Sequence, residues 1–325
     1  MTGISDSFQR PINYLRISVT DRCNLRCIYC MPEEGVALLS HRDILTYEEI
    51  YTVAKVAAGL GINRVRLTGG EPLVRLGLTE LVRILAGLKE INDLSLTTNG
   101  ILLAQYAAAL KKAGLRRVNI SLDTLKPERF RRITRCGELE DTLKGIEAAH
   151  AVGLEPVKIN MVVMDGVNDD ELIDFAHKTI EDGWHVRFIE HMPVTEDESI
   201  NLVSVKEMKR RLDILGKMEP VKMDVGNGPA KYYRFPGARG TVGFITPITE
   251  HFCYQCNRLR LTADGKLRPC LLSEEEIDLR EALRSGASSD EIKRLIEKAI
   301  ACKPERHYLS EGKKRNGRPF SQVGG

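Results

Sequence analysis

One stretch decides how this chain folds: Leu15-Arg16-Ile17-Ser18-Val19-Thr20-Asp21-Arg22-Cys23-Asn24-Leu25-Arg26-Cys27-Ile28-Tyr29-Cys30. A short β-branched segment runs directly into three cysteines with the spacing C-x3-C-x2-C, which is too tight for disulfides to satisfy all three thiols. Three thiolates therefore converge on one small volume, as an iron–sulfur cluster requires. A four-iron cluster held by three cysteines keeps one iron open, and an open position separates a reactive metal site from a structural one. A zinc knuckle is the alternative, but no fourth ligand is close by in the sequence.

The cysteine run resembles the signature of the radical S-adenosylmethionine (SAM) enzymes, including the aromatic Tyr29 before the last cysteine. The resemblance implies that the open iron chelates the amino and carboxylate groups of SAM. One electron from the cluster then cleaves SAM to methionine and a 5′-deoxyadenosyl radical. The ligands of this 4Fe-4S cluster are expected to be Cys23, Cys27 and Cys30.

Length and composition limit the other possibilities. The 325 residues are 42% hydrophobic and 29% charged, which allows one large barrel plus an extension. No apolar run approaches the roughly 18–20 residues that span a bilayer, and the first residues lack a secretory signal. We therefore expect a cytoplasmic protein with no membrane association. The net charge of +3 is mild, and we expect no nucleic-acid partner. Cys136 and Cys302 stand apart from the other cysteines and are expected to be free thiols.

Short β-branched runs alternate with helical patterns over roughly the first 190 residues, which is typical of a parallel α/β sheet. The expected strands are Leu15–Val19, Arg64–Thr68, Leu94–Thr98, Arg117–Ile120, Val157–Val163 and Val186–Glu190. The expected helices are Thr46–Leu60, Leu78–Leu88, Leu102–Ala113, Asp141–Val152 and Glu171–Ile180. Thr46 and Glu49 fit a capping box at the start of the first helix.

Unusual residues follow five of these strands, and the carboxyl ends of barrel strands form one rim where active sites lie. Besides the cysteines, these are Gly69-Gly70-Glu71-Pro72, Thr97-Thr98-Asn99-Gly100, Ser121-Leu122-Asp123 and His191-Met192-Pro193. Each segment alone is equally typical of an ordinary turn. The glycines of the first segment would let exposed backbone N–H and C=O groups approach the methionine part of SAM.

A second cysteine triplet lies in the last third of the chain. Cys253, Cys256 and Cys270 have the spacing C-x2-C-x13-C, and the spacing alone favours zinc and an iron–sulfur cluster equally. His251 would complete a Cys3His zinc site. Arg258 and Arg260 would share one face of a strand, and two guanidiniums beside a metal site suit a polyphosphate. A solvated basic surface is the alternative interpretation of this arginine pair.

Both triplets together resemble one radical SAM family over nearly the whole chain: the GTP 3′,8-cyclases of molybdenum-cofactor biosynthesis. The most specific matches are Leu15 to Cys23, Arg66 to Pro72, Gly226-Asn227-Gly228-Pro229-Ala230-Lys231-Tyr232-Tyr233, Cys253 to Cys270 and Gly324-Gly325. The resemblance implies an open, three-quarter TIM-type (β/α)6 barrel over residues 1–200. A C-terminal α+β extension over residues 201–325 would close the barrel mouth and carry the GTP site.

The resemblance also implies the site residues. A second 4Fe-4S cluster at Cys253, Cys256 and Cys270 would bind the guanine base, and the tail glycines Gly324 and Gly325 would enter the active site. The residues expected to contact SAM are Tyr29, Gly70, Ser121 and Met192. The residues expected to contact GTP are Arg16, Arg66, Thr97, Lys158, Arg258, Leu259 and Arg260.

The implied reaction converts GTP to (8S)-3′,8-cyclo-7,8-dihydroguanosine 5′-triphosphate. The SAM-derived radical would abstract hydrogen from ribose C3′, and the C3′ radical would attack guanine C8. No catalytic side chain is expected beyond this cofactor-derived radical. An electron donor is needed, and the protein is expected to be a monomer or a homodimer.

Two other functions are weighed against this one. A peptide-modifying radical SAM enzyme also carries C-terminal clusters, usually with more cysteines. An iron–sulfur electron carrier or a zinc-stabilised binding protein would not explain two three-cysteine sites with open positions.

Two residues depart from the family pattern. Gly77 stands where the family usually has Asp, at an expected helix N-cap, which Gly fills at a cost of a few tenths of a kcal/mol. His191 replaces a Tyr or an apolar residue before Met192 and is expected to be a tolerated wall residue. The basic segment 312–318 is expected to be disordered.

Overall fold

The structure is a computed structural model that describes residues 3–192, 200–223, 228–307, 318 and 320–324. Its strands are β1 (Tyr14–Ser18), β2 (Arg64–Thr68), β3 (Asp93–Thr98), β4 (Arg117–Ser121), β5 (Lys158–Val163), β6 (His185–Glu190), β7 (Glu219–Val221), β8 (Lys231–Arg234), β9 (Thr241–Ile245), β10 (Arg258–Leu261), β11 (Lys266–Arg268) and β12 (Ile277–Asp278). Its α-helices are α1 (Tyr47–Gly59), α2 (Leu78–Ala86), α3 (Leu103–Lys112), α4 (Pro127–Thr134), α5 (Leu139–Ala151), α6 (Leu172–Glu181), α7 (Val205–Leu212), α8 (Arg280–Arg284), α9 (Ser289–Ala301) and α10 (Phe320–Val323).

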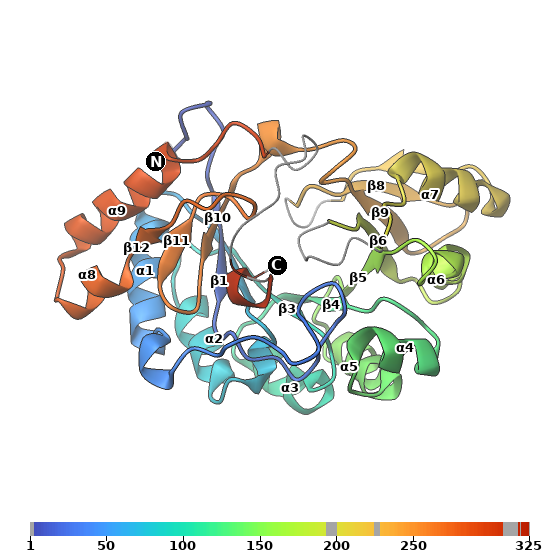
Figure 1. The fold of residues 1–325 in the computed structure, drawn as a ribbon, viewed down its shortest axis with the longest axis horizontal. Helices are drawn as coiled ribbons and strands as arrows, with labels where there is room; N and C mark the ends of the chain where they lie inside the picture. Colours follow the sequence, from blue (N-terminus) through green and yellow to red (C-terminus); the bar gives the residue numbers. More distant parts are fainter. Residues whose placement is uncertain (1–2, 193–199, 224–227, 308–317, 319, 325) are drawn as a thin grey trace.

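All strands join one curved sheet in the order β12-β11-β10-β1-β2-β3-β4-β5-β6-β9-β8-β7. Strands β1 to β6 are parallel neighbours in chain order, which confirms the predicted βα arrangement. The sheet does not close on itself, since β12 and β7 remain at its two ends. In Figure 1 the helices of the βα units lie outside the curve, and the C-terminus lies in the space that the sheet surrounds.

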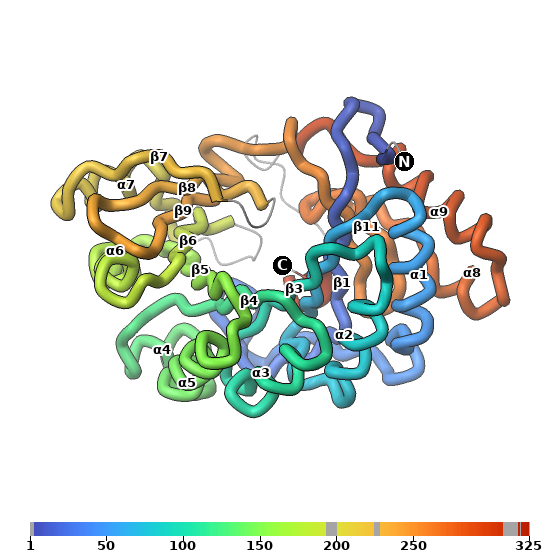
Figure 2. The backbone as a smooth tube through the Cα atoms, turned by 180° about the vertical axis from the view of Figure 1, so that it is seen from behind, coloured from blue at the N-terminus to red at the C-terminus, as the bar shows by residue number. Residues whose placement is uncertain are grey.

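The C-terminal half extends this sheet at both ends. Strand β10 pairs with β1 in parallel, and β9 pairs with β6 in parallel. Antiparallel hairpin partners then follow on each side. Figure 2 shows the two groups of C-terminal strands on opposite sides of the barrel strands. Residues beyond 200 therefore supply both walls that flank the expected six strands.

The packing explains why these segments fold as they do. Strands β1 and β2 are almost wholly buried, and helix α1 buries an apolar stripe that includes Ile50, Val53 and Ala57. The predicted capping box is present, since the Thr46 side chain accepts from the Glu49 N–H and the Glu49 carboxylate accepts from the Thr46 N–H.

The structure corrects two sequence expectations. Helix α4 was not predicted; it is short, and Pro127 opens it at a position that tolerates the missing N–H. Gly77 precedes α2 with φ of 74°, a left-handed conformation rather than the extended one of an ordinary N-cap. A glycine suits this backbone better than an Asp would, so the expected loss of local stability does not follow.

Among the described residues, no helix is both long enough and apolar enough to cross a membrane.

Candidate active site

A cavity of about 320 Å³ lies inside the curve of the sheet, and both cysteine triplets line it. The first triplet comes from the loop after β1. In the second triplet, Cys253 and Cys256 precede β10, and Cys270 follows β11. Segments far apart in the sequence thus meet because β1 and β10 are hydrogen-bonded neighbours. The predicted rim also holds, since Gly70, Thr97 and Ser121 at the ends of three strands line the same cavity.

The first triplet presents three partly buried cysteines to this cavity. Burial raises the pKa of Cys23 to about 12 and that of Cys30 to about 11, and burial with the neighbouring thiols raises the pKa of Cys27 as well. Three thiolates are unfavourable here without a cation to balance them. A cationic iron–sulfur cluster with three thiolate ligands fits this donor set.

The second triplet has a different electrostatic environment. Burial acts to raise the pKa of Cys256, but the Arg258 guanidinium and the Lys303 ammonium outweigh it and lower the pKa to about 6. Burial raises the pKa of Cys253, although a hydrogen bond from the backbone N–H of His307 acts to lower it. The two cations therefore favour the thiolate form of Cys256, which is the form that binds a metal.

The zinc alternative does not match this geometry. Among the described residues, no three His, Cys, Asp or Glu side chains converge closely enough to hold one metal ion. The His251 ring packs against His307 with centroids 5.9 Å apart, and it does not complete a Cys3His site. In a four-iron cluster each thiolate binds its own iron, so the sulfurs need not meet at one point. The second triplet fits a cluster better than a zinc ion.

The segment after β2 packs tightly against the first cysteine loop. A Cβ on Gly70 would lie 2.3 Å from the Arg22 carbonyl oxygen, so only glycine fits. The N–H of Gly70 donates to the Thr20 carbonyl and that of Glu71 to the Arg22 carbonyl, both at 2.8 Å. These two N–H groups are therefore not available for SAM, because they hold the cysteine loop in place. The expectation that carbonyl groups of this segment approach SAM stays a prediction.

The residues expected to contact SAM are brought together. Tyr29, Gly70, Ser121 and Met192 all line the cavity with the first triplet, and buried His191 lines it beside Met192. The Tyr29 hydroxyl donates to an Asp123 carboxylate oxygen at 2.8 Å, and the Val162 N–H donates to the other oxygen at 2.8 Å. Asp123 thereby fixes the aromatic side chain between two cysteines.

Strand register places arginines side by side on the inner face of the sheet. Arg16 lies opposite Arg260 on one side and opposite Arg66 on the other. Burial and the Arg260 charge lower the pKa of Arg16, and burial with the Arg258 charge lowers that of Arg260 to about 9. The lowered pKa values of these arginines reflect a site with more positive than negative charge, which suits an anionic ligand.

Arg258 and Arg260 both line the cavity, which confirms that they share a face. Leu259 lies between them and is fully buried in the hydrophobic core, so its side chain does not reach the cavity. Any contact that Leu259 makes to a ligand would come from its backbone. Thr97 also lines the cavity, and its buried hydroxyl oxygen has no hydrogen-bond partner among the described residues.

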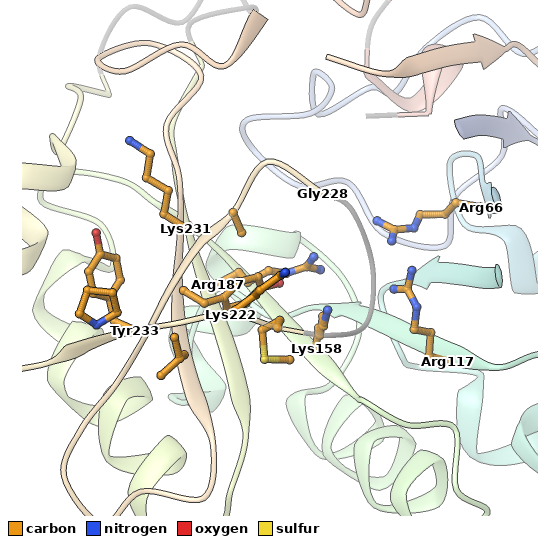
Figure 3. A pocket seen from close by; sticks show the side chains of 13 residues that line it. Arg66, Arg117, Lys158, Arg187, Lys222, Gly228, Lys231 and Tyr233 are labelled. Atoms are coloured by element: carbon orange, nitrogen blue, oxygen red, sulfur yellow. The ribbon is translucent and has the colours of Figure 1, made fainter. Parts of the chain in front are cut away.

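A second cavity of about 540 Å³ adjoins the first, and Arg66, Arg187 and Gly228 line both. Lys158 lines this second cavity, together with Arg117 and Lys222. In Figure 3 the charged ends of the Arg66, Arg117, Lys158 and Arg187 side chains point into the same space. Lys231 points away from it and pairs with Glu250 at 2.7 Å.

Sequence reasoning missed Arg117, which begins β4, and Arg187, which lies within β6. Polar partners on other strands of the sheet orient them. The Arg187 guanidinium donates to the Asn119 side-chain oxygen at 2.6 Å, and Arg117 pairs with Asp93 at 2.6 Å. Arg66 donates to the Ser95 hydroxyl at 3.2 Å. A buried cation within a strand is the signal that would have found these residues.

The C-terminal tail enters the first cavity. The Arg260 guanidinium donates to the Gly324 carbonyl oxygen at 2.6 Å, and Ser321 lines the cavity. A Cβ on Gly324 would lie 2.7 Å from the Thr68 methyl carbon, so the tail fits because it lacks a side chain there. Gly325, Gly226, Asn227 and segment 312–317 lie outside the described residues. Arg318, which belongs to the segment expected to be disordered, forms an ion pair with Asp264 at 2.8 Å.

Cys136 and Cys302 are exposed free cysteines, as expected.

Comparison with known proteins gives the family. Residues 17–179 match the model of the radical SAM superfamily, and residues 184–309 match that of Molybdenum Cofactor Synthesis C. The GTP 3′,8-cyclase of Pelotomaculum thermopropionicum is 54% identical over 99% of this chain and 100% of the relative. That of Moorella thermoacetica is 53% identical over the same shares.

Among solved structures, Streptococcus suis SuiB bound to S-adenosylmethionine superimposes with a TM-score of 0.61 at 16% identity. The match covers 87% of this chain and 68% of SuiB, and it supports the fold alone. The curated relatives show more than the fold, because they match 99% of this chain at 53–54% identity. This chain belongs to the GTP 3′,8-cyclase family of radical SAM enzymes.

Proposed function

We propose that this chain converts GTP to 3′,8-cyclo-7,8-dihydroguanosine triphosphate while SAM is cleaved to methionine and 5′-deoxyadenosine. One observation carries the proposal: two cysteine triplets and a cation-lined extension belong to adjoining cavities that share Arg66 and Arg187. The two clusters, SAM and a charged substrate can therefore be accommodated in these adjoining cavities.

In this proposal Cys23, Cys27 and Cys30 hold one 4Fe-4S cluster, and Cys253, Cys256 and Cys270 hold the other. When bound, the clusters would supply the electron for reductive SAM cleavage and an open iron for the guanine base. Tyr29, Gly70, Ser121 and Met192 would surround SAM, because they line the cavity beside the first triplet.

The chain's cations would hold the triphosphate. Arg16, Arg258 and Arg260 line the first cavity, Lys158 lines the second, and Arg66 lines both. Guanidiniums bind phosphate oxygens through charge-assisted, bidentate hydrogen bonds. We add Arg117 and Arg187 to this set, since both line the second cavity. Thr97 and the Leu259 backbone are the neutral contacts.

The walls of the cavity would protect the radical. Apolar side chains and the tail around Gly324 would exclude water from the space between SAM and the ribose C3′. Glu71 fixes the rim, because its buried carboxylate accepts from the Thr98 hydroxyl and the Asn99 N–H, each at 2.7 Å. Residues 1–200 would carry the SAM half and residues 201–325 the second cluster.

The surroundings of the enzyme complete the proposal. Eight free cysteines suit the reducing cytoplasm. An electron donor would reduce the first cluster, and the protein would act as a monomer or homodimer with no nucleic-acid partner.

An anaerobic assay with dithionite, SAM and GTP tests the proposal. Mass spectrometry should detect 5′-deoxyadenosine and the cyclised nucleotide together. Cys27→Ala leaves two ligands at the first triplet and should abolish 5′-deoxyadenosine formation with or without GTP. SAM cleavage by the wild type without any cyclised nucleotide, at saturating GTP, would contradict the proposed substrate.

A further inference from the structure

The segment Lys303–His307, here called the strap, follows α9 and runs behind the second cysteine triplet. The Lys303 ammonium donates to the carbonyl oxygen of Arg258 at 2.9 Å and to that of Pro269 at 2.6 Å. Arg258 lies two residues after Cys256, and Pro269 directly precedes Cys270. One side chain thus joins the two segments that carry these cysteines.

The strap also reaches the third cysteine. The His307 N–H donates to the Cys253 thiol, and Arg10 bridges the Cys253 carbonyl at 2.7 Å to the Glu305 carbonyl at 2.8 Å. All three cysteine-bearing segments are therefore fastened to the strap. The cysteine spacing alone does not reveal this, because the strap lies over 30 residues further along the chain.

The charge of Lys303 distinguishes it from Arg10. Arg10 forms an ion pair with Asp6 at 2.6 Å, so its charge is locally balanced. Lys303 is 3% exposed and has no carboxylate partner within the described part of the chain. A buried ammonium without an anion is costly. Burial lowers the Lys303 pKa, and the neighbouring Cys256 and Cys270 side chains act in the opposite direction.

Lys303 does not act on the substrate directly. In the part of the chain that the structure describes, it lines neither of the two cavities. Arg258 and Lys303 both lower the pKa of Cys256, but Arg258 faces the cavity and Lys303 only the carbonyls behind it. Any effect of Lys303 must pass through the cysteine segments and their thiolates.

We propose that Lys303 is a positioning residue of the second cluster site, which fixes the Cys256 and Cys270 segments and offsets the negative charge of a bound cluster. The inference rests on the proposed 4Fe-4S cluster at this triplet. A buried positive charge favours the reduced, more negative state of a cluster and so raises its reduction potential. Loss of the charge should lower that potential.

The test uses full-length protein in which Cys23, Cys27 and Cys30 are changed to Ala, so that only the second cluster is present. Lys303→Met removes the charge and both hydrogen bonds at similar length, and Lys303→Arg retains the charge. Lys298→Met, at an exposed lysine on α9, is the matched control. The readouts are the midpoint potential from a redox titration followed by electron paramagnetic resonance and the rate of iron loss to a ferrous chelator.

Lys303→Met should shift the potential to a more negative value and release iron faster, while Lys298→Met should match the parent. Lys303→Arg should stay close to the parent potential. If Lys303→Met does not fold, Lys303→Gln, which keeps a donor without the charge, should show the same negative shift.

Two results would overturn the inference, and they are distinguishable. A cluster present in the parent with the same potential and iron release in Lys303→Met and Lys298→Met would refute the role of Lys303 alone. Absence of any four-iron cluster from the parent would refute the proposed second cluster, and the inference with it.

Discussion

We expect substrate binding to depend on the cations of the inner face of the sheet. Arg16, Arg66 and Arg260 are neighbours in strand register, and each side chain is held on the inner face of the sheet. Their like charges repel in the absence of a ligand. A triphosphate relieves this repulsion, so affinity should depend on phosphate charge more than on the base.

Arg260→Ala should weaken GTP binding about tenfold to a hundredfold, because a charge-assisted hydrogen bond contributes roughly 1.5–3 kcal/mol. Guanosine has no phosphates and should lose less affinity. Isothermal titration of both ligands checks this, with Arg83→Ala at an exposed ion pair on α2 as the control. Equal losses for GTP and guanosine would show that Arg260 supports the base site or the tail instead.

Lys158 should make GTP binding depend on pH. Burial, with the charges of Arg187, Arg117 and Arg66, lowers its pKa to about 6. Without a ligand the Lys158 amine is therefore mostly neutral above pH 6, whereas a bound triphosphate favours the charged form and raises the pKa. Between the two pKa values, binding takes up a proton, so GTP affinity should fall as pH rises above 6.

Calorimetry in buffers of different ionisation enthalpy measures that proton uptake. Lys158→Arg stays charged at all working pH values, so its proton uptake at pH 7.5 should be smaller than in the wild type while binding persists. The same proton uptake in the variant as in the wild type would assign it to another group.

At the scale of elements, each cysteine-bearing segment is held in place by another element of the fold. The Gly69–Pro72 segment supports the first cysteine loop through backbone hydrogen bonds, and the strap supports the second triplet. These supports come from strands and helices adjacent in space rather than in sequence. Damage to a support should therefore affect one triplet and spare the other.

Gly70→Ala tests this separation. The new methyl group would lie 2.3 Å from the Arg22 carbonyl oxygen, so the first cysteine loop must shift. We expect SAM cleavage to fall by at least tenfold, while iron at the second triplet and GTP binding persist. Gly59→Ala on α1, where a Cβ meets nothing within 4 Å, is the control. Normal SAM turnover in Gly70→Ala would show that the loop tolerates displacement.

Local pattern was enough to predict β1 to β6 and the helices between them except α4, because alternation and capping are properties of neighbouring residues. It was not enough for β9 and β10, whose parallel pairing with β6 and β1 depends on segments far along the chain. The same limit applies to the site. Both cysteine triplets are visible as motifs, whereas Arg117, Arg187 and Lys303 gain their roles only from tertiary contacts.

At the scale of the whole molecule, the fold brings two metal-binding halves to one cavity. The N-terminal half provides β1 to β6, and the C-terminal half adds a wall at each end of the sheet. Neither half alone encloses the space between the triplets. Function should therefore separate into SAM cleavage, which needs the first triplet, and cyclisation, which needs both.

Changing Cys253, Cys256 and Cys270 together to Ala should reduce bound iron from about eight atoms to about four, as expected for the loss of one four-iron cluster. GTP cyclisation should cease while some SAM cleavage remains. Iron analysis of anaerobically reconstituted protein and product analysis check both parts. Stoichiometric zinc with only one cluster in the wild type would contradict this expectation.

The pairing of β10 with β1 also has a consequence for biogenesis. Strand β1, which carries Arg16, cannot pair with β10, which carries Arg260, until most of the chain has left the ribosome. Contacts between such distant segments form slowly. During that interval the first cysteine loop stands at an unfinished sheet edge, open to solution. We therefore expect the first triplet to bind iron more readily before the C-terminal strands dock than after.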